Sequence, residues 1–366
     1  MAITVARRRP CAVRVSYSAE SNDLTPDRSG PTHLQSGSNH EDQESGDERT
    51  HAHEVVLVNP PLNATNRIQA GELSIAYVDE GRHDAEPVVL LHGFPYDIHS
   101  YDDVVPLLVE AGFRVLVPYL RGHGPTTFLR PDGPRSGQQA ALGADLLAFM
   151  DALGLENPIL AGYDWGARAA CVVSALWPDR VRGLVSVNGY LIQDIATSQL
   201  PIRPDLEAGL WYFWYFSTDR GRAGLSENRK AIAEVIWKRN SPEWHFTRDH
   251  LDLVAESFEN AAYVDVVIHS YRHRLGLAPG DPQYEEIESE LSKRPVITVP
   301  TVTLDGQADG NFPATDGSST AHLFSGPRLH RQVPRAGHNL PAESPRSFAE
   351  AIRDVADPSG LGKGTP

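Results

Sequence analysis

Apolar and polar residues follow one another in blocks that predict a chain of alternating strands and helices. A continuous apolar run such as residues 87–92 is typical of a strand that is buried on both faces. Alternation of strand and helix over residues 87–188 predicts a parallel sheet with right-handed crossovers and helices on both faces. The expected strands are 55–58, 73–78, 87–92, 114–118, 159–161, 181–188, 299–304 and 329–333, and the expected helices include 100–111, 138–153 and 347–355.

The alternation stops between residues 190 and 295. This stretch has no convincing buried strand and is too long to be a loop. It is rich in helix-forming and aromatic residues, including Trp211, Trp214, Trp237 and Trp244. We therefore expect a helical lid inserted into the sheet domain, with the substrate held between lid and sheet.

The remaining boundaries follow from composition. Residues 1–54 are rich in Ser, Asp, Glu, Asn, His and Pro, and we expect them to form a disordered extension. Residues 55–189 and 296–357 are expected to form the two parts of the sheet domain, and residues 358–366 a flexible tail.

The charge and the cysteine content restrict the possible partners and the compartment. A formal charge of -15 over 366 residues argues against nucleic acid and anionic membrane surfaces as partners. We find no apolar run long enough for membrane insertion, and the arginines at 7–9 are not followed by an apolar signal core. Two cysteines make a disulfide framework unexpected, so we expect a cytoplasmic protein.

The most informative stretch is residues 162–166, Gly-Tyr-Asp-Trp-Gly, between an expected strand and an expected helix. The two glycines permit a sharp turn that would push the side chain of Asp164 outward, as in a nucleophile elbow. A carboxylate is already charged at neutral pH and needs no base to act as a nucleophile. Taken alone, the same pattern also fits an aspartate that caps a helix.

Further chemical groups follow neighbouring strands. The backbone N–H groups of Phe94, in the turn His-Gly-Phe-Pro at 92–95, and of Trp165 are expected to form an oxyanion hole. Asp309 follows one late strand and His338 follows the last, which gives the chain order nucleophile, acid, histidine. Asp305 is the alternative acid.

Together these motifs resemble the α/β-hydrolase superfamily, in particular its aspartate-nucleophile branch of epoxide hydrolases and haloalkane or haloacid dehalogenases. The resemblance covers about residues 67–357 and implies an α/β-hydrolase fold, with a mostly parallel eight-stranded sheet and an inserted helical lid. It implies a catalytic triad of Asp164, Asp309 and His338 and requires no metal or organic cofactor. Tyr163 stands where epoxide hydrolases usually have histidine, and Tyr119 where an aspartate is common.

The lid is expected to determine which bond is broken. The resemblance implies that two lid tyrosines, here Tyr212 and Tyr271, hydrogen-bond to the oxygen of an opening epoxide. The alternative is that these rings only pack the lid. A small apolar or amphipathic substrate is expected, in contact with the residues His92, Pro95, Trp211 and Trp214.

Three functions therefore stay open, and epoxide hydrolysis is the favoured one. A haloalkane dehalogenase would use the indoles of Trp165 and of Trp211 or Trp214 to hold the halide. A haloacid dehalogenase needs cations for the substrate carboxylate, for which Arg168 matches one position, although Trp165 replaces the arginine expected after the nucleophile. The third function is a hydrolase-fold protein that binds without catalysis. A homodimer is possible.

Overall fold

The computed structural model of the protein describes residues 59–198 and 200–362. The expected disordered extension at residues 1–54 and the expected strand at 55–58 lie outside these ranges, as do residues 363–366 of the expected tail. Residues 358–362 belong to the folded body, because the N–H of Arg328 donates to the carbonyl of Gly362 at 3.0 Å and Leu361 packs against the core. The structure thus places residues 358–362 against the core, and the flexibility expected for residues 358–366 stays a prediction.

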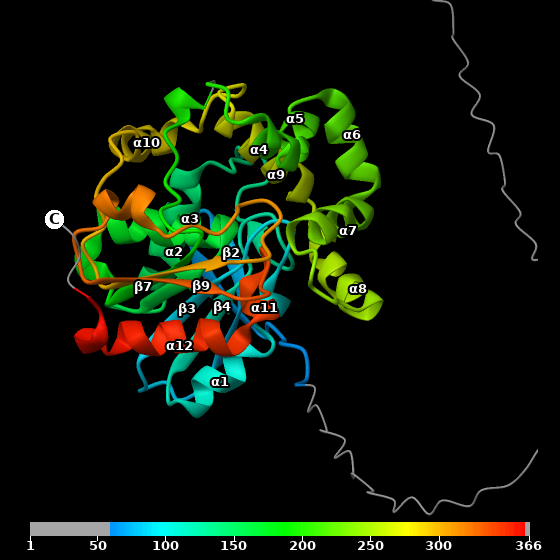
Figure 1. Cartoon of the computed structure of the whole chain (residues 1–366). Coiled ribbons are helices and arrows are strands. Elements are labelled where there is room, and N and C mark those ends of the chain that lie inside the picture. The colour runs from blue at the N-terminus through cyan, green and yellow to red at the C-terminus, as the bar shows by residue number, and fades with distance from the viewer. Residues whose placement is uncertain (1–58, 199, 363–366) are drawn as a thin grey trace, which may run out of the picture. The chain divides into compact units, whose positions relative to one another are not determined.

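One mixed sheet organises the described residues, with the strand order β1-β2-β4-β3-β6-β7-β8-β9 and with β5 added to β2 (Figure 1). All neighbours from β4 to β9 are parallel, whereas β1, β2 and β5 pair antiparallel at one edge. The predicted α/β-hydrolase fold is confirmed, although the sheet of the described residues has nine strands where eight were expected. The strands are β1 Asn66–Ala70, β2 Leu73–Glu80, β3 Pro87–Leu91, β4 Arg114–Pro118, β5 Thr127–Phe128, β6 Ile159–Gly162, β7 Gly183–Val187, β8 Thr301–Gly306 and β9 Arg328–Val333.

The first edge strand differs from the sequence-based expectation. Its partner β2 was predicted, but β1 was not, because only every second residue of Asn66–Ala70 turns inward and most are polar. The buried strands β3, β4 and β6 are almost wholly apolar, and their predicted bounds agree with the structure to within one residue. A strand that is buried on both faces is thus easier to predict from sequence than an edge strand that is buried on one face.

Helices cover both faces of the sheet. Helices α1 (Val104–Glu110) and α12 (Pro345–Ala356) pack together on one face, and α2 (Gln139–Ala152) and α3 (Asp164–Leu176) pack together on the other (Figure 1). The helix expected over residues 100–111 is divided into a 3-10 turn, η1 (Ile98–Tyr101), and α1.

A run of helices separates β7 from β8, within the stretch for which the sequence predicts a lid (Figure 1). Among the described residues, no helix has both the length and the apolar character that crossing a membrane would require. The helices are α4 Pro204–Gly209, α5 Trp211–Phe216, α6 Asp219–Glu227, α7 Arg229–Asn240, α8 Arg248–Glu256, α9 Tyr263–Arg274 and α10 Glu285–Leu291.

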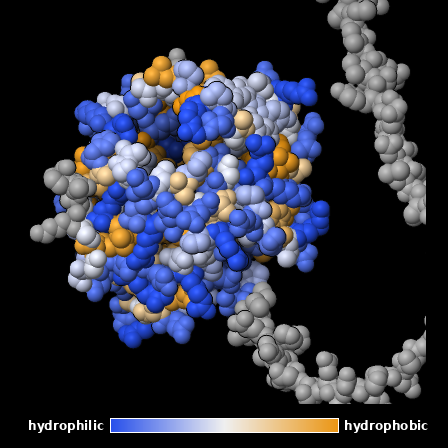
Figure 2. Space-filling model, viewed as in Figure 1, coloured by the Kyte–Doolittle hydropathy of each residue, from blue (hydrophilic) through white to orange (hydrophobic). Residues whose placement is uncertain are grey.

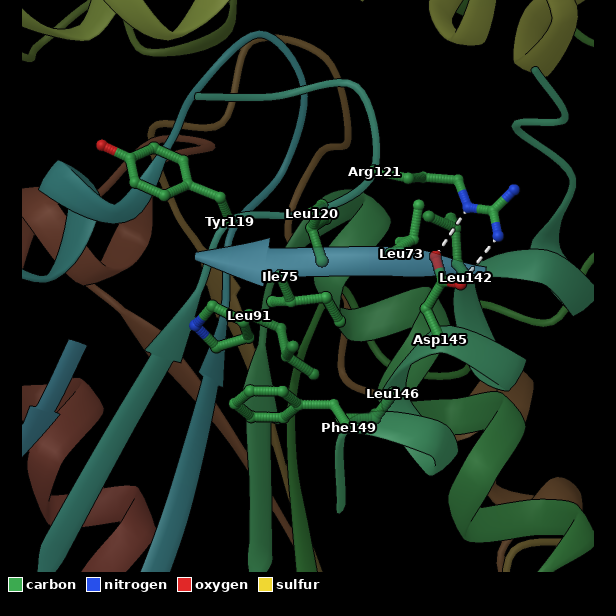
Figure 3. Close-up of a pocket in the computed structure, with 11 residues that line it drawn as sticks. Leu73, Ile75, Leu91, Tyr119, Leu120, Arg121, Leu142, Asp145, Leu146 and Phe149 are labelled. Carbon is green, nitrogen blue, oxygen red and sulfur yellow. Dashed lines mark hydrogen bonds and ion pairs between the residues drawn. The ribbon is translucent and has the colours of Figure 1, made fainter. Parts of the chain in front are cut away.

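A buried ion cluster ties the antiparallel edge of the sheet to α2. The guanidinium of Arg121, in the loop after β4, donates to both carboxylate oxygens of Asp145 on α2 at 2.6 and 2.7 Å, and to Glu72 at 2.8 Å. Figure 3 shows Arg121 and Asp145 facing each other beside a small cavity that Leu73 and Phe149 also line. Asp164 does not line this cavity. The cluster therefore holds the fold together and is separate from the elbow.

We predict that Arg121→Met lowers the free energy of unfolding by about 3–5 kcal/mol, because the substitution leaves the Asp145 carboxylate buried without its cation. Urea denaturation followed by tryptophan fluorescence measures the change. Arg130→Met is the matched control, because Arg130 is exposed and its replacement should change stability by less than about 0.5 kcal/mol. Equal effects of the two substitutions would contradict the structural role of the cluster.

Candidate active site

The turn between β6 and α3 forces the side chain of Asp164 outward. Asp164 is the first residue of α3 and has φ 49, a left-handed conformation that is strained for a residue with a side chain. A Cβ atom at Gly166 would lie 2.0 Å from the carbonyl oxygen of Leu91, so only glycine fits where α3 passes β3. The sequence-predicted elbow geometry is present.

The loop after β3 approaches the Asp164 carboxylate closely. A Cβ atom at Gly93 would lie 2.5 Å from the Cβ of Asp164, which explains the glycine at this position. The backbone N–H of Phe94 donates to Oδ1 of Asp164 at 2.8 Å. Trp165 follows Asp164 in the first turn of α3, where backbone N–H groups have no intrahelical acceptor. Of the two expected oxyanion donors, the N–H of Phe94 therefore contacts the Asp164 carboxylate, and that of Trp165 belongs to the next residue along the chain.

His338 lies between two carboxylates. Its Nδ1 atom is 2.8 Å from Oδ2 of Asp309, and its Nε2 atom is 3.7 Å from Oδ2 of Asp164. The side chains of His338 and Asp309 are almost fully buried. The structure therefore brings together Asp164, Asp309 and His338 from the carboxyl ends of β6, β8 and β9.

Asp309 is held by backbone donors. Its Oδ1 atom accepts hydrogen bonds from the N–H groups of Asn311 and Phe312, each at 2.8 Å, and Asn188 donates to Oδ2 at 3.3 Å. The alternative acid, Asp305, lies in β8 and accepts instead from the N–H and the hydroxyl of Thr315 at 2.9 and 2.8 Å. This geometry favours Asp309 as the partner of His338.

The charges of these groups are coupled. Burial alone would lower the pKa of His338, but the charge of Asp309 and contact with Asp164 raise it to about 10. Burial alone would raise the pKa of Asp164, but the contact with His338 lowers it below the usual range of a carboxyl group. At neutral pH the free protein therefore holds an imidazolium between two carboxylates.

Tyr212 on α5 and Tyr271 on α9 lie side by side near the elbow. Their ring centroids are 5.4 Å apart with the rings nearly perpendicular, and Tyr271 lies 6.0 Å from the ring of Trp165. Burial, followed by nearby negative charge that includes Asp164, raises the pKa of both hydroxyls. Both tyrosines therefore keep their protons and can donate hydrogen bonds.

Asn311 connects the acid loop to this tyrosine pair. Its side-chain amide donates to the hydroxyl oxygen of Tyr212 at 3.2 Å, while its backbone N–H binds Asp309. Because the Tyr212 oxygen accepts from Asn311, the hydroxyl proton is free to point elsewhere. Sequence reasoning missed Asn311, and its only signal is its position two residues after Asp309.

The loop residues expected to contact substrate are engaged with the protein itself. His92 is fully buried; its Nδ1 atom contacts the carbonyl of Gly93 at 3.0 Å, and its Nε2 atom accepts from the N–H of Leu120 at 3.1 Å. The carbonyl of Pro95 accepts from the indole of Trp237 on α7 at 2.8 Å. His92 has no ring nitrogen left for a substrate, so that expectation is not supported.

The two tryptophans of α5 lie differently from each other. Trp214 is 48% exposed, and its indole donates to Glu207 at 3.1 Å, so the structure does not bring it to Asp164. Trp211 packs beside Tyr212, with ring centroids 6.0 Å apart. Of these two residues, only Trp211 adjoins the tyrosine pair.

The end of α7 clamps the loops that carry the acid and the histidine. The carbonyl of Asn240 accepts from the N–H groups of Gly310 at 3.0 Å and His338 at 3.2 Å. The hydroxyl of Ser241 accepts from the same His338 N–H at 3.0 Å and donates to Glu343 at 2.6 Å. This end of α7 therefore contacts the loops of Asp309 and His338 directly, which the sequence pattern did not indicate.

The described ranges contain no group of three or more His, Cys, Asp and Glu residues arranged to bind a metal ion.

Comparisons with known proteins identify the family. The alpha/beta hydrolase fold family matches residues 86–345 of the chain. The chain is 25% identical over 311 residues to epoxide hydrolase A of Mycobacterium tuberculosis, covering 78% of this chain and 94% of that protein. It is 36% identical over 123 residues to a haloalkane dehalogenase of Psychrobacter cryohalolentis, covering 33% of this chain and 39% of that protein.

A solved structure extends the likeness over the described residues. A crystal structure from Klebsiella pneumoniae, provisionally assigned as an epoxide hydrolase, is 45% identical with a TM-score of 0.78. The match covers 80% of this chain and 97% of that one. The resemblance stated from the sequence is thus confirmed. The chain belongs to the α/β-hydrolase fold family and is similar to its epoxide hydrolases.

Proposed function

We propose that the protein hydrolyses an epoxide to a vicinal diol through a covalent ester on Asp164. The observation that carries this proposal is the pairing of two protonated, buried tyrosines, Tyr212 and Tyr271, beside an ionised carboxylate. Opening an oxirane requires a nucleophile at carbon and hydrogen-bond donors at oxygen at the same moment. The likeness to epoxide hydrolases supports the same chemistry.

In the first step, a carboxylate oxygen of Asp164 attacks an oxirane carbon and the carbon–oxygen bond breaks. The departing oxygen takes a proton from Tyr212 or Tyr271, leaving a hydroxyalkyl ester and a tyrosinate. The imidazolium of His338 then returns a proton to the tyrosinate. This transfer is favoured because the ester has no charge, so one of the two carboxylates that raised the pKa of His338 is lost.

In the second step, the neutral His338 removes a proton from water, and the hydroxide attacks the ester carbonyl. The N–H groups of Phe94 and Trp165 stabilise the oxyanion, and Asp309 stabilises the imidazolium that forms. Collapse of the intermediate breaks the ester bond, and the departing diol oxygen takes the remaining proton of the added hydroxyl group, so that Asp164 is released as a carboxylate. The proton gained from water stays on His338, so the ion pair of the resting protein is restored.

Dehalogenation is the second candidate. The indole Nε1 of Trp165 is buried and makes no hydrogen bond of normal geometry among the described residues, although it lies close enough to the Tyr271 hydroxyl to reduce the rise that burial causes in the pKa of that group. Of the two candidates for the second indole, Trp214 is exposed and bonded to Glu207, which leaves Trp211 beside Tyr212. A protein that only binds is disfavoured by the assembled set of Asp164, Asp309 and His338.

The proposed substrate is a small apolar or amphipathic molecule, and the proposed compartment is the cytoplasm, since the sequence has few cysteines. Figure 2 shows apolar side chains in small separate groups on the visible face of the described residues, among mostly hydrophilic ones. The possible homodimer stays a prediction.

The proposed coupling predicts that Asp164→Asn lowers the pKa of His338. The amide keeps the shape of the carboxylate but removes a negative charge that favours the imidazolium, so the pKa should fall from about 10 toward neutrality. NMR titration of the labelled imidazole measures it. Asp305→Asn is the control and should leave the titration unchanged, because Asp305 binds Thr315 instead. An unchanged pKa in Asp164→Asn would contradict the coupling.

If Tyr212 and Tyr271 hydrogen-bond to the oxirane oxygen, their replacement should slow epoxide opening more than halide release. Tyr212→Phe and Tyr271→Phe should each lower kcat/KM for diol formation from styrene oxide by about 10²-fold or more. Tyr215→Phe is the matched control from the same helix, because Tyr215 packs on Trp211 and should tolerate the change. Halide release from 1-chlorobutane, measured in parallel, tests the second candidate. Release that exceeds epoxide opening would favour the dehalogenase.

A further inference from the structure

Arg168 is a buried cation without an acidic partner. It lies on α3, one helical turn after Asp164, and is only 8% exposed. Its Nε atom is buried with no hydrogen-bond partner, and Nη1 reaches only the side-chain oxygen of Gln139, at 3.5 Å. Within residues 59–198 and 200–362, no carboxylate forms an ion pair with it. A buried charge of this kind is costly unless something compensates it.

A second cation approaches the same place from the lid. The guanidinium of Arg274, at the end of α9, lies over the rings of Phe213 at 4.5 Å and Tyr271 at 5.5 Å. Its Nε atom donates to the side chain of Gln193 at 3.0 Å. In the described ranges this arginine also lacks an acidic partner.

The amides of Gln139 and Gln193 join the two arginines, and Nε2 of Gln139 also donates to the carboxylate of Glu288 at 3.1 Å. The Gln139 side chain donates to the carbonyl of Gln193 and accepts from its N–H, both at 2.9 Å. Burial, followed by the charge of Arg274, lowers the pKa of Arg168. The Asp164 carboxylate offsets part of this charge, but Asp164 is also the partner of His338. Arg168 is thus buried without an ion pair, while the carboxylates of Asp164 and Glu288 are each bound by other groups.

We propose that Arg168 and Arg274 bind an anionic group of the substrate, so that the site accepts an oxirane that carries a carboxylate. Arg168 follows Asp164 by four residues and is close enough for the Asp164 charge to act on its pKa, so a carboxylate bound to Arg168 would lie near a carbon that faces Asp164. Guanidinium groups bind carboxylates through paired, charge-assisted hydrogen bonds. The orientation places the oxirane oxygen toward Tyr271 and the carboxylate toward the two arginines.

This inference rests on the proposed function for the oxirane, but its first test does not need turnover. Isothermal titration calorimetry compares 2,3-dihydroxypropanoate, the diol that glycidate would give, with its neutral amide. We expect the wild-type protein to bind the carboxylate at least tenfold more tightly than the amide, and Arg168→Gln and Arg274→Gln each to remove this preference. Equal binding of the two compounds, or no binding of the carboxylate, would overturn the proposal.

Arg272→Gln is the matched control for these variants. Arg272 lies on the same helix as Arg274 but pairs with Asp219 at 3.2 Å, so its replacement should leave the preference intact. Loss of the preference in this control as well would overturn the site assigned here.

Turnover then separates a binding role from an effect on the nucleophile. If the arginines only stabilise the Asp164 carboxylate, Arg274→Gln should slow glycidate and glycidamide equally. If they bind the substrate, the ratio of kcat/KM for glycidate over glycidamide should fall at least tenfold. Equal slowing overturns the inference. Failure of the wild-type protein to open either compound or styrene oxide contradicts the proposed function instead, and the calorimetric result still decides the anion site.

Discussion

The placement of one imidazolium between two carboxylates constrains the rest of this structure. His338 contacts Asp309 at 2.8 Å and Asp164 at 3.7 Å, in an interior where unbalanced charge is costly. Each member comes from the carboxyl end of a different parallel strand, so the register of β6, β8 and β9 must be correct for the charges to meet. The order of the strands, the turn at Asp164 and the hydrogen bonds from the end of α7 to the loops of Asp309 and His338 all help to position these three side chains.

The helices between β7 and β8 take part in this arrangement and do more than cover it. Asn240 and Ser241, at the end of α7, accept hydrogen bonds from the backbone of the histidine loop, and Asn240 also from the acid loop. The indole of Trp237 reaches the carbonyl of Pro95 in the loop that approaches Asp164. Movement of α7 would therefore change the position of His338 and of the Phe94 N–H together.

Local patterns were sufficient to predict the parallel strands, the elbow and the loops that carry Asp309 and His338, because each depends on a few adjacent residues. The sequence did not predict contacts between distant segments: the clamp of Ser241 on His338, the bond from Asn311 to Tyr212, and the edge strand β1. It also assigned Trp214 to the site because of its residue type, whereas the helix turns that side chain to the surface. The type of a residue indicates which chemistry its side chain can perform, but the packing of the helix determines where that side chain points.

The covalent role of Asp164 is tested most directly by a single turnover with styrene oxide in ¹⁸O-labelled water, followed by mass analysis of the peptide that contains Asp164. If water attacks the ester carbonyl, one labelled oxygen enters the Asp164 carboxylate and the first diol released is unlabelled. If water attacks the oxirane directly, the label appears only in the diol and the peptide mass is unchanged. That second result would contradict the account.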